Sequence, residues 1–140
     1  LGLVGSEMCI RDSFIQRSMI DVIGGDTSGP DAILDELRKR RDATVEGLNA
    51  IDGISINTPN STFYLFPNVT KIMERKRLTD VNQLMTEALT ETGVSFCTRK
   101  HFGRMLENET NQYLRFAYSG ISVEDINEGM AKLKQYFESA

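Results

Sequence analysis

Two kinds of hydrophobic spacing alternate along this chain, and together they limit the folds open to it. Over residues 30–50 apolar side chains recur every three or four positions, which predicts a long amphipathic helix. The same spacing predicts a short helix over 14–23 and longer ones over 80–92 and 122–137. Between these patterns lie short segments at 54–56, 62–66, 94–97 and 113–118, whose alternation or content of aromatic and β-branched residues predicts strands.

The predicted order after the first segment is helix, strand, strand, helix, strand, strand, helix. Asp80 and Ser122 are suited to begin helices, and Gly93 is suited to end one. Loops between paired strands indicate an antiparallel or mixed sheet of about four strands, packed by helices mainly on one face. The predicted fold class is therefore α+β, and a chain of 140 residues is long enough for one core.

Charge and cysteine content exclude several functional classes. Sixteen Lys and Arg against twenty Asp and Glu give a net charge of −4, and the basic residues form only short clusters such as 38–41. We therefore expect no nucleic-acid or membrane partner. The apolar runs are too short for a transmembrane helix. Two cysteines, Cys9 and Cys97, form at most one disulfide, which indicates a reducing compartment and a cytoplasmic protein.

The first thirteen residues have no clear periodicity. The run LVGSEMCIRDS at 3–13 resembles the translation of a transposase sequencing adapter, such as remains when an untrimmed read is assembled. We expect residues 1–13 to be disordered or irregular and not to belong to the fold. The natural sequence would then continue upstream of Phe14.

No complete catalytic or metal-binding motif is present. The sequence contains no G-x-G-x-x-G, P-loop, H-E-x-x-H or C-x-x-C pattern. His101 is the only histidine, and Cys97 lies four residues before it. A thiol–imidazole pair would need a third, orienting group, so we expect a loop histidine and a buried strand cysteine. Two such ligands are also too few for zinc, and no metal site is expected.

Arg115 is the one candidate binding residue. It lies within YLRFAY, where a guanidinium among apolar neighbours is costly unless it meets an anion. Strand alternation would direct Leu114, Phe116 and Tyr118 into the core and Arg115 to the opposite face. A forked cation is suited to holding a carboxylate. The pattern alone favours a salt bridge over a bound ligand.

Three longer segments resemble a known enzyme family. NTPNSTFYLFPNV, GVSFCTRKHFG and NQYLRFAYSGISVEDINEGMAKLKQYFE, in this order and spacing, resemble the carboxy-terminal part of class I/II pyridoxal-phosphate-dependent aminotransferases of the aspartate aminotransferase fold type. The resemblance covers essentially all of 14–140. It implies that 30–140 is the small domain of a fold-type I enzyme, and that 14–29 is a remnant helix and loop from the edge of the large domain.

The resemblance also implies a role for Arg115. The matching arginine of the family binds the α-carboxylate of the amino-acid substrate, and Phe63 and Tyr64 match an aromatic segment near the active-site mouth. Two departures stand out: Ser61 replaces a usual glycine, and residues 98–101 replace a usual Pro-Gly.

Most of the family's chemistry would lie elsewhere in the intact enzyme. The Schiff-base lysine, the aspartate that pairs with the pyridine nitrogen and the phosphate-binding cup are upstream in the family, and no segment here matches them. We therefore expect no catalytic and no cofactor-binding residue in this chain, no bound pyridoxal phosphate and no transaminase activity. The intact enzyme would be a homodimer that transfers an amino group between an amino acid and a 2-oxo acid. The alternatives are a stand-alone module that binds small carboxylates and a structural domain in which Arg115 is salt-bridged.

Overall fold

The computed structural model describes residues 13–104 and 106–139. The chain divides into two units, Leu1–Asp35 and Glu36–Ala140. In the first unit, helix α2 (Ser13–Ile23) confirms the helix predicted over 14–23, and helix α3 (Ser28–Asn49) begins before Pro30. The expected adapter segment lies outside the described residues except for Ser13, and Cys9 lies outside them as well.

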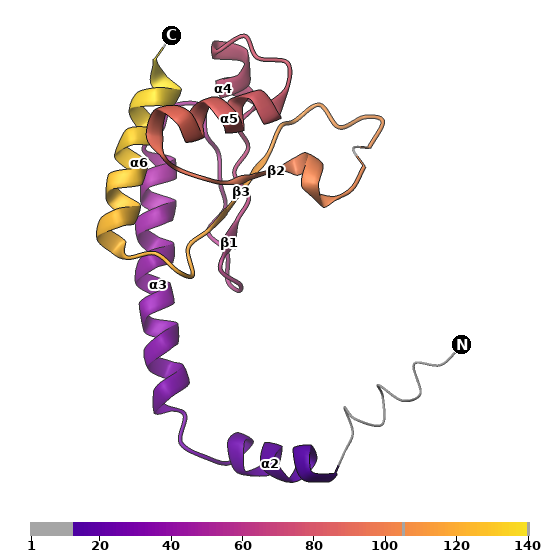
Figure 1. Ribbon diagram of the computed structural model, residues 1–140, viewed down its shortest axis with the longest axis vertical. Helices are drawn as coiled ribbons and strands as arrows, with labels where there is room; N and C mark the ends of the chain where they lie inside the picture. The colour runs from indigo at the N-terminus through magenta and orange to yellow at the C-terminus, as the bar shows by residue number, and fades with distance from the viewer. Residues whose placement is uncertain (1–12, 105, 140) are drawn as a thin grey trace. The chain divides into compact units, whose positions relative to one another are not determined.

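The second unit contains a small antiparallel sheet and its helices (Figure 1). After α3 the elements are β1 (Tyr64–Leu65), α4 (Thr70–Arg75), α5 (Val81–Thr92), β2 (Cys97–Thr98), the 3₁₀ helix η1 (Arg99–Phe102), β3 (Leu114–Ala117) and α6 (Val123–Glu138). The strand order is β1-β3-β2, with Leu65 opposite Phe116 and Cys97 opposite Arg115. The α+β class is confirmed.

The sheet has three strands in the described residues, whereas the sequence predicted about four. The segment predicted as a strand at 54–56 forms only one antiparallel bridge, between Ser55 and Asn68. Asn68 in turn forms an isolated bridge with Tyr113. The segment at 54–56 is therefore joined to the sheet only through Asn68 and does not add a strand to it. Two short helices, α4 and η1, were not predicted, and η1 occupies part of the expected loop at 98–111.

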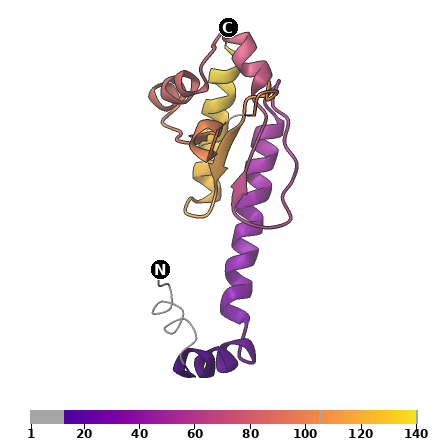
Figure 2. The ribbon, with the colours of Figure 1, turned by 90° about the vertical axis from the view of Figure 1, so that its right-hand side faces the viewer.

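The core lies on one face of the sheet. Leu114, Phe116 and Tyr118 of the central strand region are buried, as alternation predicted. The second half of α3 and α6 lie side by side in both views (Figures 1 and 2), and Gly47 of α3 lies against Met130 of α6. The helices, strand β1 and the connecting segments contribute further buried apolar residues: Val45, Leu48, Ile51, Leu65, Val69, Ile72, Met73, Val81, Leu84, Ala88, Phe96, Ile126, Leu133 and Phe137.

The helix ends follow the predicted local chemistry. The carboxylate of Asp80 accepts a hydrogen bond from the backbone N–H of Asn82, and the hydroxyl of Ser122 accepts one from the N–H of Asp125. Gly93 ends α5 in the left-handed conformation. None of the helices in the described part of the chain is long and apolar enough to cross a membrane.

Candidate functional site

Arg115 lies in the central strand, on the face opposite the core. Leu114 and Phe116, which flank it along the strand, are buried, while Arg115 itself is half-buried. The guanidinium carbon lies 4.4 Å from the ring centroid of Tyr64, in the edge strand β1, and 4.4 Å from that of Phe102, at the end of η1. Both contacts are cation–π interactions, which stabilise the charge without using its N–H donors.

Among the described residues, the polar contacts of Arg115 do not include a carboxylate. One Nη2–H donates to the sulfur of Cys97, its partner in the ladder, at 3.5 Å. A thiol is a weak acceptor. Among the ion pairs of the described residues, none contains Arg115. The salt bridge that the pattern favoured is therefore not formed within the described part of the chain.

Tyr64 is held from the loop before it. The backbone N–H of Tyr64 donates to the hydroxyl of Thr62 at 3.3 Å, and the carbonyl of Thr62 accepts from the hydroxyl of Tyr118 at 2.8 Å. Burial raises the pKa of Tyr118, so this hydroxyl stays protonated and donates. Thr62 has φ of 65°, a left-handed conformation that is rare for a β-branched residue.

The residues Cys97 and His101 do not form a thiol–imidazole pair. The ring of His101 interacts with Thr98: Nδ1 accepts from the backbone N–H at 3.3 Å and lies 2.9 Å from the hydroxyl. Cys97 is half-buried beside Arg115 and not buried as predicted, because alternation in β2 directs Thr98 into the core instead. His101 is exposed and belongs to η1 and not to a loop.

Phe102 is the site residue that sequence reasoning missed. It stands in GVSFCTRKHFG, one of the segments that carried the resemblance, but nothing in its spacing predicts a contact with Arg115. Its ring also lies edge-on to Phe66, with centroids 6.5 Å apart, and Phe66 stacks on Tyr113 at 5.2 Å. Arg115 thus lies within a cluster of partly exposed aromatic side chains.

A separate pocket of about 420 Å³ lies on the helix-covered side of the sheet. Phe116, Tyr118, Ile126 and Gly129 are among its lining residues, and Arg115 is not. Within the described ranges, no group of three or more side chains could hold a metal ion. The candidate site is therefore the exposed face around Arg115.

In fold, the chain matches a segment of known aminotransferases. No family model matches the chain. The alanine aminotransferase from Pyrococcus furiosus superposes with a TM-score of 0.72 at 23% identity, over 85% of this chain and 28% of that protein. The pyridoxal-phosphate-bound C–S lyase from Staphylococcus hominis has the same fold, with a TM-score of 0.62 at 14% identity, over 76% of this chain and 26% of that protein.

A curated relative gives the same class from sequence. The asparagine–oxo-acid transaminase of Streptococcus mutans is 33% identical over 88 residues, which are 63% of this chain and 22% of the relative. The chain spans about a quarter of the length of the curated relatives that it matches. Its curated relatives are thus aminotransferases, and its structural neighbours include aminotransferases of the fold-type I kind.

The residues around Arg115 do not themselves fit pyridoxal phosphate. The cofactor requires an amine for a Schiff base and a carboxylate for its pyridine nitrogen. The contacts of Arg115 in the described part of the chain are a thiol and two aromatic rings. Lys100, which belongs to the same 3₁₀ helix as Phe102, is ion-paired with Asp80. These groups can hold an anion, but they supply neither the amine nor the carboxylate that the cofactor needs.

Proposed function

We propose that the chain is the carboxy-terminal part of a pyridoxal-phosphate-dependent aminotransferase, in which Arg115 holds the α-carboxylate of the substrate. The intact enzyme would transfer an amino group between an amino acid and a 2-oxo acid. The observation that carries the proposal is a half-buried guanidinium that two aromatic rings contact and that no acidic side chain neutralises among the described residues.

The surroundings of Arg115 suit a carboxylate. A guanidinium presents pairs of N–H donors along its edge, which match the two oxygens of a carboxylate. Tyr64 and Phe102 cover part of the group with carbon, and the lower local dielectric strengthens the interaction with an anion. The strand backbone and the two rings also hold the side chain before the ligand arrives, which reduces the entropy lost on binding.

The proposal extends to the intact enzyme. Pyridoxal phosphate, when bound there, would act as the electron sink for the amino-group transfer, with its lysine and phosphate site outside this chain. The enzyme would be a cytoplasmic homodimer. Two observations support a cofactor site outside this chain: the chain spans about a quarter of the length of its curated relatives, and its resemblance over 14–140 is to the carboxy-terminal part of the family. The chain alone would have no transaminase activity.

Titration of the purified chain with acetate, followed by NMR, tests the role of Arg115. We expect saturable binding that Arg115→Ala abolishes and Arg115→Lys weakens about tenfold, because the ammonium lacks the paired donors. Arg104→Ala is the matched control, since it removes an exposed arginine from the neighbouring loop. Equal binding by wild type and Arg115→Ala, or none by wild type, would contradict the proposal.

Absorbance spectroscopy tests the expected inactivity. The chain is mixed with equimolar pyridoxal phosphate, and no stable visible Schiff-base band should appear. Activity with added amino acid and 2-oxo acid should equal that of the free cofactor. A stoichiometric band together with catalytic turnover would refute the claim that the lysine lies outside this chain.

A further inference from the structure

The segment that carries Phe102 is organised by polar contacts of Arg99. Its Nη1 donates to the carbonyls of Phe102 at 3.4 Å and Gly103 at 3.2 Å, and Nη2 donates to that of Arg104 at 3.2 Å. None of the residues of η1 is buried. Core packing therefore does not hold this 3₁₀ helix. Polar contacts hold it instead: those of His101 with Thr98, the ion pair of Lys100 with Asp80, and the three from the guanidinium of Arg99.

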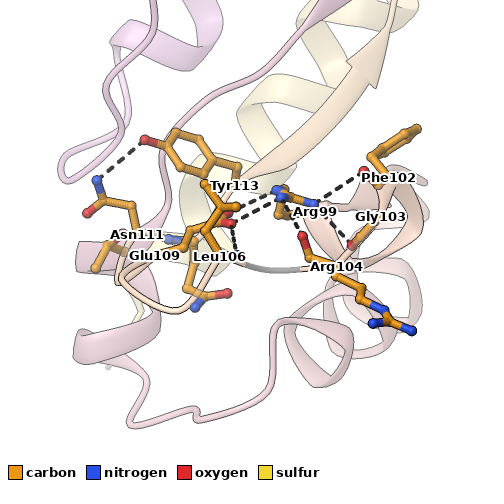
Figure 3. A network of polar contacts seen from close by, with 10 residues as sticks. Arg99, Phe102, Gly103, Arg104, Leu106, Glu109, Asn111 and Tyr113 are labelled. Atoms are coloured by element: carbon orange, nitrogen blue, oxygen red, sulfur yellow. Dashed lines mark hydrogen bonds and ion pairs between the residues drawn. The ribbon is translucent and has the colours of Figure 1, made fainter.

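Glu109 fixes that guanidinium from the other side (Figure 3). Its two carboxylate oxygens lie 2.9 Å from Nε and 3.0 Å from Nη2 of Arg99, and one of them also accepts the backbone N–H of Leu106 at 3.1 Å. The side chains of Arg99 and Glu109 are only 17% and 13% exposed. Solvent screens such a pair less than a surface ion pair, so its geometry is well defined.

The backbone of Arg99 is also hydrogen-bonded to the segment that leads into β3, the strand of Arg115. The backbone N–H of Arg99 donates to the carbonyl of Tyr113 at 3.0 Å, two residues before Arg115. Phe102 itself is 43% exposed and its ring lies edge-on to Phe66, so packing fixes the side chain only in part. The position of the Phe102 ring over Arg115 therefore depends on the backbone of 102–104, which Arg99 and Glu109 hold by hydrogen bonds.

We infer that Arg99 and Glu109 are a positioning pair that keeps the ring of Phe102 against the guanidinium of Arg115 and thereby sets its affinity for a carboxylate. The inference rests on the proposed function of Arg115. Neither residue of the pair is placed in contact with the ligand. Loss of the pair would release Phe102, and water would then compete for the donors of Arg115.

The NMR signal of the Arg115 Nε–H group reports the contact directly. Aromatic rings 4.4 Å from the guanidinium carbon should displace this signal by ring currents. Arg115→Lys assigns the signal by removing it, and Phe102→Leu defines the part that is due to Phe102. Glu109→Gln, which keeps the shape of the side chain but not its charge, should remove that same part. An unchanged signal in Glu109→Gln would overturn the inference.

Acetate titration of the full chain tests the consequence for affinity. We expect Glu109→Gln, Arg99→Lys and Phe102→Leu each to weaken binding about three- to tenfold. The double variant Glu109→Gln/Phe102→Leu should bind no more weakly than Phe102→Leu, because Glu109 acts only through that ring. Losses that multiply in the double variant would overturn the inference.

Glu128→Gln is the matched control. It removes one negative charge from an exposed ion pair with Lys132 on α6, and it should change acetate affinity by less than about twofold. Far-UV circular dichroism establishes that each variant is folded. If the wild-type chain binds no acetate, the proposed function and the effect on affinity both fail. A displaced Arg115 signal that still depends on Glu109 would identify that failure as one of ligand binding and not of positioning.

Discussion

Gly93 occupies a backbone conformation that a side chain would strain. It ends α5 with φ of 74°, and its N–H donates to the carbonyl of Leu89 at 2.9 Å. A Cβ at this position would meet no atom within 4 Å, so the strain of the left-handed conformation is the whole cost of Gly93→Ala. We expect the free energy of unfolding to fall by about 1 kcal/mol, measured by urea denaturation.

Gly120 provides the matched control for that prediction. A Cβ at Gly120 would likewise meet no atom within 4 Å, but the φ of this residue lies outside the left-handed range. Gly120→Ala should change the free energy of unfolding by less than about 0.5 kcal/mol. Equal effects of the two substitutions would show that backbone conformation does not distinguish these glycines.

At the scale of single residues, sequence reasoning succeeds where the chemistry is local. Asp80, Gly93 and Ser122 were predicted as helix ends because a cap acts within three or four residues of its own position. The face of Arg115 followed from alternation alone. Its contacts with Tyr64 and Phe102 could not be predicted, because they join segments that only the folded sheet brings together.

Among the elements, α3 and α6 approach closely at a glycine. A Cβ on Gly47 would lie 2.5 Å from Cγ and 2.7 Å from Cβ of Met130. Overpacking of this kind costs about 1–3 kcal/mol, and the better helix propensity of alanine returns about 1 kcal/mol. We expect Gly47→Ala to lower the free energy of unfolding by about 1 kcal/mol or more, measured by urea denaturation.

Two further variants separate backbone approach from side-chain crowding at this contact. Met130→Ala retains the Cβ that lies 2.7 Å from the added methyl, so Gly47→Ala should remain destabilising in that background. Gly29→Ala is the control within the same helix, because a Cβ there meets no atom within 4 Å. Because Gly29 precedes Pro30, the crowding of the new Cβ by the proline ring offsets the gain in helix propensity, and we expect little change in the free energy of unfolding. Full rescue by Met130→Ala would contradict this view of the contact.

The existence of the long elements was predictable, and the extent of the short ones was not. The hydrophobic spacing identified α2, α3, α5 and α6, since each extends over several helical turns. A strand of two residues, such as β1 or β2, is defined by its hydrogen-bonded partner and leaves little pattern of its own. The alternation at 54–56 predicts a strand, but Ser55 forms only an isolated bridge with Asn68. So short an alternation does not show whether a partner strand is present.

For the whole molecule, the chemical groups around Arg115 set what the site can do. The sheet and the 3₁₀ helix beside it supply a cation, two rings and a thiol, and these can orient an anion but cannot transfer an amino group. The sequence resemblance implies that the remaining chemistry belongs to segments that have no match here, and this stays a prediction. The polar network behind Phe102 was not anticipated, since Arg99 lies in the segment that replaces the usual Pro-Gly.

The apolar face of α2 has a consequence for the behaviour of the chain in solution. Met19, Ile20, Val22 and Ile23 are all exposed, with Ile20 at 70% and Ile23 at 76%. A continuous apolar patch of this kind favours association.

We expect the chain to self-associate in a concentration-dependent manner in sedimentation velocity. The double variant Ile20→Lys/Ile23→Lys should shift it toward the monomer without changing the far-UV circular dichroism. Leu106→Lys is the matched control, because Leu106 is 75% exposed but lies in a loop and not on α2, and it should leave association unchanged. A wild-type chain that stays monomeric at high concentration would contradict this prediction.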